Sequence, residues 1–382
     1  MGGPVSEILA VFLSENANGN PYFAQEIMTF WLEANQTRNK KDKDKEDTGV
    51  STPSIFLLPN DVNSLLIARL DRLEPKVKRV VQAASVLGRE FELRVLSRMM
   101  DDDVHLEEHI RVGEEQRLWL AMSKGRYRFG NVLLRNAAYE MQSRARLQDL
   151  HRRAAQAIQE IYADDVDSHA TALGRHFQRA GKVEEARDNF LKGARKAAER
   201  YAHGEAKRLY RAYFKLTKDP TDESVVVHYE FALRVLETQG RFDEAIEEHR
   251  RVIDEAQRLG DRASEALGHL GLGRVNWSMG KFDNARAHYE HALITAREAG
   301  SVWHEGKALL ALARLHRDQG RVDHARTFFE HALHNARKMS NPTEERAILA
   351  DLALVYDQLG HAREAMALRE QAFAIARAMR QA

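Results

Sequence analysis

Arginines recur at one register of the C-terminal part of the chain, at Arg234, Arg274 and Arg314, each 40 residues from the next. Trp277 and Arg317 follow one helical turn later. Guanidinium groups bind carboxylates through paired hydrogen bonds, and an indole ring offers an apolar contact surface. If helices turn these side chains to one side, the row predicts a binding site for an acidic or C-terminal peptide of another protein. The alternative is that the arginines cover a solvated groove and form salt bridges with neighbouring repeats.

A second pattern, His105-Leu106-Glu107-Glu108-His109, matches the inverted zinc-peptidase motif H-x-x-E-H. On a helix, His105 and His109 lie one turn apart and could hold zinc. A catalytic site also needs a third ligand and a cleft, so we interpret the pair as exposed imidazoles of a polar helix. His331, His334 and the other histidines of the repeats have the same interpretation. We therefore predict no metal site and no catalytic residue.

Composition and absent motifs exclude several functions. The sequence contains no G-x-x-x-x-G-K-[ST] phosphate loop, so the chain should not bind or hydrolyse ATP by itself. It has no cysteine, which excludes disulfide scaffolds and fits a cytoplasmic location. Its 58 Lys and Arg nearly cancel its 57 Asp and Glu, which rules out a uniformly basic nucleic-acid binder. No apolar run is long enough for a membrane span. We predict a non-enzyme without cofactor or membrane partner.

The elements that position the arginines are helices in a repeat. Proline is absent between Pro75 and Pro220 and between Pro220 and Pro342, as expected of helical segments. Three registers recur every 40 residues in four copies, the first a glycine and the others alanines. They are Gly240, Gly280, Gly320 and Gly360; Ala245, Ala285, Ala325 and Ala365; and Ala256, Ala296, Ala336 and Ala376. The glycine allows a tight turn between two helices, and the alanines let these helices pack closely.

The repeat resembles the tetratricopeptide family, lengthened from about 34 residues to 40. Leu272, Gly273, Tyr289 and Ala292 follow the family spacing. The resemblance implies four repeats over 221–382, arranged as an α-solenoid. Two degenerate units are expected in a helical bridge over 131–220; their residues are Leu173, Gly174, Phe177, Ala186 and Phe190, then Ala206, Tyr210 and Tyr213.

The segment 59–130 predicts a winged-helix-like domain. Helices are expected over 61–73, 75–87, 91–100 and 104–116, followed by a hairpin from Leu118 to Phe129. The stretch 101–117, which would read DNA, holds seven acidic residues against two arginines, so it would repel phosphate. The hairpin carries Lys124, Arg126 and Arg128, which could touch a backbone. We expect DNA to be an unlikely partner. The fold class is all-α apart from this hairpin.

The order of motifs along the whole chain resembles the C-terminal half of STAND signalling ATPases, found in bacterial transcriptional activators and in adenylate-cyclase or kinase fusions. It runs from Gly19-Asn20-Pro21 through the winged hairpin to the repeats. The resemblance implies that 1–36 is a remnant of the ATPase lid, whose Pro21 touches adenine. Asn131 stands where relatives often carry a nucleotide-sensing histidine. Between the lid remnant and the winged helix, 37–58 is expected to be a charged, mobile linker.

Three functions follow as hypotheses. The first is a non-catalytic regulatory or scaffolding module that binds another protein through its repeats. The second is the sensor half of a STAND-type transcription regulator or cyclase, whose ATPase domain lies in the same or another polypeptide. The third is a DNA-binding regulator that acts through the winged helix. For the first, we expect Arg274→Glu to weaken partner binding and to leave stability nearly unchanged, because a solvated arginine contributes little to it.

Overall fold

The computed structural model describes residue 28 and residues 62–100 and 104–381. The predicted lid remnant with Pro21 and the predicted linker therefore lie outside the described residues, apart from Met28. The chain divides into two compact units, 1–189 and 190–382, and each is described by itself. The division falls inside the segment that we predicted as a helical bridge.

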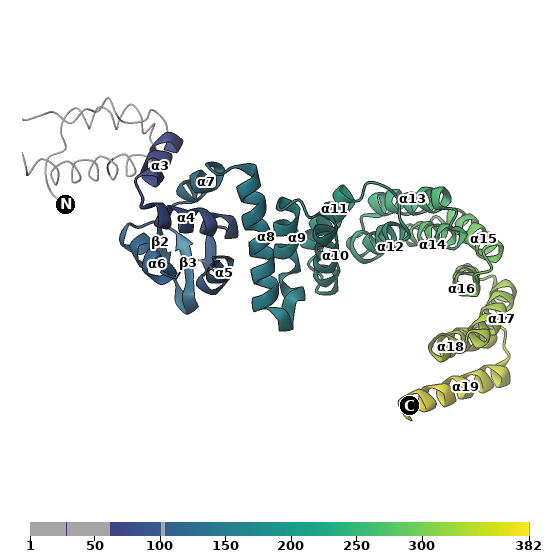
Figure 1. Cartoon of the computed structure of the whole chain (residues 1–382). Coiled ribbons are helices and arrows are strands. Elements are labelled where there is room, and N and C mark those ends of the chain that lie inside the picture. Colours follow the sequence, from purple (N-terminus) through teal and green to yellow (C-terminus); the bar gives the residue numbers. More distant parts are fainter. Residues whose placement is uncertain (1–27, 29–61, 101–103, 382) are drawn as a thin grey trace, which may run out of the picture. The chain divides into compact units, whose positions relative to one another are not determined.

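The first unit combines helices with one small sheet (Figure 1). The expected hairpin is confirmed, because β2 and β3 pair antiparallel with Trp119 opposite Phe129. A third strand, β1, pairs with the other edge of β3. We had placed these residues at the start of a helix, since a three-residue strand that pairs with distant residues leaves no periodic pattern. The elements are α3 (Val62–Asp71), α4 (Pro75–Leu87), β1 (Glu90–Glu92), α5 (Leu93–Met99), α6 (Leu106–Glu115), β2 (Trp119–Ala121), β3 (Arg126–Phe129), α7 (Val132–Glu140), α8 (Arg144–Ile161) and α9 (Ala170–Arg179).

Aromatic side chains join the sheet to the helices of this unit. Phe91 of β1, Trp119 of β2 and Phe129 of β3 are buried, with ring centroids 5.5 to 5.9 Å apart. The indole nitrogen of Trp119 donates a hydrogen bond of 3.0 Å to the carbonyl of Ile110 in α6. Because a buried indole N–H needs an acceptor, this bond fixes α6 against the sheet.

The second unit is built from antiparallel helix pairs that stack in sequence order (Figure 1). In the first pair, α12 continues into a π-helical turn (Ala232–Leu236) and a 3-10 turn (Glu237–Gln239). The helices are α10 (Val183–Glu199), which contains the boundary between the units, α11 (His203–Leu216), α12 (Asp222–Phe231), α13 (Phe242–Leu259), α14 (Arg262–Ser278), α15 (Phe282–Glu298), α16 (Val302–Asp318), α17 (Val322–Lys338), α18 (Pro342–Gln358) and α19 (Ala362–Gln381).

The four glycines of the repeat occupy the turns within the pairs, as predicted. Gly240, Gly280, Gly320 and Gly360 have φ between +68° and +78°, a left-handed conformation that costs glycine no steric strain. The alanines five residues later are fully buried, so the two helices of each pair approach closely. The predicted solenoid of 40-residue repeats is confirmed.

A second set of turns, between the pairs, also repeats every 40 residues. Gly260, Gly300 and Ser340 have φ of +73°, +63° and +53°. We had not singled out this register, because serine replaces glycine in the third copy. Asp261 and Asn341 then cap α14 and α18, with side-chain oxygens that accept from backbone N–H groups of the first turn.

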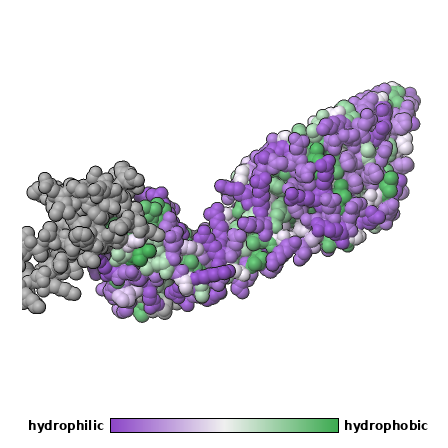
Figure 2. Space-filling model, turned by 90° about the horizontal axis from the view of Figure 1, so that it is seen from above, coloured by the Kyte–Doolittle hydropathy of each residue, from purple (hydrophilic) through white to green (hydrophobic). Residues whose placement is uncertain are grey.

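Hydrophilic side chains cover most of the face shown in Figure 2, with small apolar patches between them. In the described part of the chain, no helix has the length and apolar character required to cross a bilayer.

Candidate functional site: the groove of the repeats

A cavity of about 450 Å³ opens across the first helices of three successive repeats. Leucines and aromatic rings form most of its wall, and three cationic side chains lie among them. The lining residues are Tyr229 and Leu233; Leu267, Leu270, Arg274 and Trp277 of α14; Tyr289 of α15; and Trp303, Lys307, Leu310, Ala311 and Arg314 of α16.

The structure brings together three of the five residues that the arginine register singled out, Arg274, Trp277 and Arg314. Arg234 is exposed but does not line the cavity; it lies in the π-helical turn, where Leu233 takes the place in the wall. A π turn adds backbone between neighbouring side chains, so the 40-residue register no longer fixes the direction of a side chain there. Arg317 lies outside the lining and pairs with Asp351 and Asp318.

Arg274 is held by a network that joins two repeats. Its Nε and one Nη donate to the two carboxylate oxygens of Glu237, both at 2.8 Å, and its other Nη donates to the hydroxyl of Tyr229 at 3.0 Å. The ring of His249 reaches the same carboxylate through Nε2 at 2.8 Å. His249 is fully buried against α14, where a Cβ at position 271 would come within 2.3 Å of the imidazole. Only a glycine fits at Gly271.

The electrostatics of this network follow from burial and pairing. Burial by itself would raise the pKa of Glu237, but hydrogen bonds from Arg274 and His249 outweigh it and hold that pKa below its usual value. Burial lowers the pKa of His249, against the opposing effect of Glu237. For Arg274, the hydrogen bonds to Glu237 and Tyr229 outweigh burial and raise the pKa. The Glu237 carboxylate and the Arg274 guanidinium are therefore both charged.

The expectation that Arg274 is a solvated arginine, replaceable by glutamate at little cost, is wrong. Its side chain is 29% exposed and its partner Glu237 only 11%. Replacing it with glutamate would leave two carboxylates facing each other in a site largely removed from water. The register showed that Arg274 recurs, but not that an acid from the preceding repeat lies beside it.

Arg314 makes the corresponding pair with the following repeat. Its Nε and one Nη donate to one oxygen of Asp351, at 3.0 and 2.9 Å, and Arg317 takes the other oxygen at 2.9 Å. Lys307 pairs with Glu344 at 2.9 Å. Salt bridges between repeats, the alternative that the sequence left open, are thus present. Peptide binding by the arginine row remains a prediction.

The register missed Trp303 and Lys307, which complete the far wall of the cavity. Trp303 is 41% exposed, and the Lys307 ammonium lies 5.4 Å from the centre of its ring. Neither residue recurs 40 positions away. The signal that could have found them is local: positions 303, 307, 310 and 314 lie on one face of a single helix.

Several histidines depart from the expected surface position. His331 and His334 are exposed as predicted, whereas His109, His228, His249 and His316 are buried. Burial is possible because partners replace water: His228 has a Glu248 oxygen 2.6 Å from Nδ1, and His316 stacks on Phe328. Within the residues that the structure describes, no three or more His, Asp or Glu side chains form a group able to hold a metal ion.

Asn131 has a structural contact in the first unit. Its side-chain oxygen accepts a hydrogen bond of 2.7 Å from the backbone N–H of Leu133, which caps α7. Its assignment as a nucleotide-binding remnant remains a prediction.

Comparison with known proteins supports the repeats. Tetratricopeptide-repeat family models match residues 234–298 and 307–342. The C-terminal region therefore consists of tetratricopeptide repeats, which are generally protein-interaction modules without catalytic activity. No curated protein sequence matches the chain.

Solved structures share the fold at low identity. The chain is similar to BtubC (BKLC) from P. vanneervenii, at 19% identity and a TM-score of 0.45, with 63% of this chain and 93% of that chain covered. It is also similar to a STAND protein with a tetratricopeptide repeat sensor from Pyrococcus horikoshii, at 14% identity and a TM-score of 0.43, over 98% of this chain and 60% of that chain. Aspartyl phosphate phosphatase F from Bacillus subtilis matches at 11% identity and a TM-score of 0.42, over 98% and 96%. At these identities the similarity says nothing of activity.

Proposed function

We propose that this chain is a non-catalytic regulatory or scaffolding protein that binds an acidic segment of a partner protein in the groove of its repeats. The observation that carries the proposal is the composition of the cavity wall. Leu267, Leu270 and Leu310 offer apolar surface, and Arg274, Lys307 and Arg314 stand among them. A ligand with both aliphatic side chains and carboxylates matches such a wall.

Because each cation already has a carboxylate partner, apolar contact must supply most of the affinity, and the cations mainly select the ligand. Arg314 uses Nε and one Nη on Asp351, which leaves its other Nη group for a ligand carboxylate. Trp303, exposed at the edge of the groove, is the side chain best placed to cover an apolar residue of the ligand. The partner segment is therefore expected to alternate aliphatic and acidic residues.

A phage-displayed library of random 12-residue peptides tests this proposal. Peptides selected on the wild-type protein should be rich in aliphatic residues with Asp or Glu, and Trp303→Ala should weaken their binding by about tenfold. Ile294→Ala is the matched control, since Ile294 is a similarly exposed apolar residue outside the cavity lining. If the selected peptides bind the Trp303→Ala and wild-type proteins equally, the groove is not their binding site.

A second candidate is the sensor half of a STAND-type regulator or cyclase. It is supported by the motif order in the sequence and by the succession of α4, β1, α5, α6, β2 and β3, in which three helices accompany a three-stranded antiparallel sheet. We interpret this succession as a winged helix that serves as an internal switching module, because the exposed side chains of α6 include Glu107, Glu108 and Glu115, which disfavour DNA. A cytoplasmic location is part of the same proposal.

Calorimetry with ATP and ADP separates the two candidates. We expect no binding, because the sequence lacks a phosphate loop. Micromolar affinity for either nucleotide would favour the sensor function, and an isolated STAND ATPase domain that bound this chain in a nucleotide-dependent way would do the same.

A further inference from the structure

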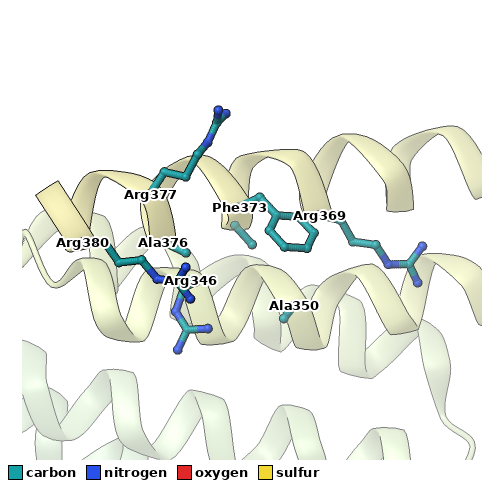
Figure 3. A pocket seen from close by; sticks show the side chains of 8 residues that line it. Arg346, Ala350, Arg369, Phe373, Ala376, Arg377 and Arg380 are labelled. Carbon is teal, nitrogen blue, oxygen red and sulfur yellow. The ribbon is translucent and has the colours of Figure 1, made fainter.

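A second surface lies on the helix pair α18 and α19, away from the groove. It surrounds a cavity of about 370 Å³ (Figure 3). Phe373 of α19 is 71% exposed there, and no helix covers it in the described part of the chain. The lining residues are Arg346 and Ala350 of α18, and Arg369, Ala372, Phe373, Ala376, Arg377 and Arg380 of α19.

The same face is covered in the two preceding repeats. Leu293 and Leu333, which stand 80 and 40 residues before Phe373, are only 8% and 7% exposed. They are covered because α16 packs on α15 and α18 packs on α17. Ala296 and Ala336, which correspond to Ala376, are also buried. The face around Phe373 is thus built on the same plan as two faces that each bind a helix.

A polar contact recurs at these covered faces. Arg297 donates to Glu305 at 2.9 Å, and Arg337 donates to Glu345 at 2.8 Å. In both, a residue near the end of one helix binds a glutamate in the first turn of the helix that covers it, eight positions later in the sequence. Arg377 is the next member of this series, and its side chain makes no hydrogen bond or ion pair with any described residue.

The charge of the surface favours an acidic ligand. Four arginines and no acid line the cavity. Arg369 pairs with Asp357, but Arg346 and Arg380, like Arg377, have no ion-pair partner among the described residues. Unpaired guanidiniums around an exposed phenylalanine attract carboxylates and leave apolar surface to be covered.

We propose that this surface binds an amphipathic helix of a partner protein. The helix carries a glutamate in its first turn, which pairs with Arg377, and apolar residues three and four positions later, which cover Phe373 and Ala376. Those are the spacings of Glu305 to Ala308 and Leu309, and of Glu345 to Ile348 and Leu349, all four of which are buried. The site is separate from the groove and does not rest on the function proposed for it.

A peptide with the sequence of residues 341–358 tests the proposal, because it contains Glu345, Ile348 and Leu349 in the required register. The fluorescein-labelled peptide is titrated with the whole 382-residue protein and followed by fluorescence anisotropy. We expect saturable binding that Phe373→Asp weakens about tenfold or more. Met366→Asp is the matched control, since Met366 is an equally exposed apolar residue of α19 outside the cavity and should leave binding unchanged.

A charge exchange tests the predicted register. Arg377→Glu should weaken the wild-type peptide about fivefold, and a peptide with Glu345→Lys should regain affinity for that variant. Circular dichroism establishes that each variant keeps its helical content. Absence of saturable binding, or equal binding by wild-type and Phe373→Asp proteins, would overturn the proposal. Self-association that is lost in Phe373→Asp would also overturn it, because the occupant would then be a second copy of this chain.

Discussion

At the scale of single residues, the groove is governed by partners that lie about one repeat away. Arg274 lies 37 residues after Glu237, and Arg314 lies 37 residues before Asp351. Lys307 and Glu344 show the same separation. Each pair joins the first helices of neighbouring repeats, so these charges stabilise the stacking of repeats as well as shaping the groove.

Removal of Arg274 should therefore destabilise the second unit. We expect Arg274→Met to cost about 3 kcal/mol of unfolding free energy, because it leaves the Glu237 carboxylate buried beside His249 without its cation. The double variant with Glu237→Gln should recover much of that loss, since the uncompensated charge is then absent. Urea unfolding followed by circular dichroism measures both. Arg234→Met, at an exposed position of the same register, is the control and should change stability by less than about 0.5 kcal/mol.

At the scale of elements, buried histidines join α7, α8 and α9 in the first unit. The Tyr139 hydroxyl lies 2.9 Å from Nε2 of His151, and Nδ1 of His151 lies 2.9 Å from Nδ1 of His176. Two facing Nδ1 atoms can share only one proton, so the chain is satisfied when both rings are neutral. Burial lowers the pKa of His151 to about 3 and that of His176 to about 4, and the nearby charge of Arg179 adds to both shifts.

This arrangement predicts acid sensitivity. Because both pKa values are lower in the folded state than the ordinary 6.5, the unfolded chain binds more protons below that pH. The stability contributed by the pair is complete above pH 6.5 and is lost as the pH falls toward 4. The melting temperature should thus drop more steeply between pH 7 and 5 in the wild type than in His176→Gln. Parallel curves for the two proteins would contradict the assignment.

The turns between repeats carry a correctable strain. Ser340 adopts a left-handed conformation at the register where Gly260 and Gly300 stand. Ser340→Gly should stabilise the protein by about 0.5 to 1 kcal/mol, since relief of the strained φ exceeds the added entropy of the unfolded chain. Gly300→Ser is the reverse test and should destabilise, although a side chain there would meet no neighbour within 4 Å. Thermal unfolding of both variants decides this, and a destabilised Ser340→Gly would show that the serine makes a contribution of its own.

At the scale of the whole molecule, the compact units divide near Asn189, inside α10. A fragment that begins at Val183 keeps this helix whole and contains every residue of both proposed binding surfaces. Solenoids are stabilised by contacts between neighbouring repeats, so residues 183–382 should fold alone. We expect a cooperative thermal transition by circular dichroism and unchanged binding of the library-selected peptides. A fragment without such a transition would show that the repeats depend on the first unit.

The sequence by itself determined the repeat, because tight turns need glycine and close helix packing needs alanine wherever they occur. The four glycines and their alanines therefore located every helix pair from Asp222 onward, and the hairpin from Trp119 to Phe129 followed from its turn. Short β1 escaped, since its pairing depends on residues more than 30 positions away.

Only the tertiary structure decided which repeated residues face one another. Arg274 reads as a surface residue until Glu237 of the preceding repeat is placed beside it, and Arg234 leaves the groove because a π turn intervenes. Phe373 occupies the same register as two buried leucines, yet it is exposed. Periodicity specifies the face of a helix on which a residue lies. Whether that face meets an acid, a leucine or water depends on contacts between helices far apart in the sequence.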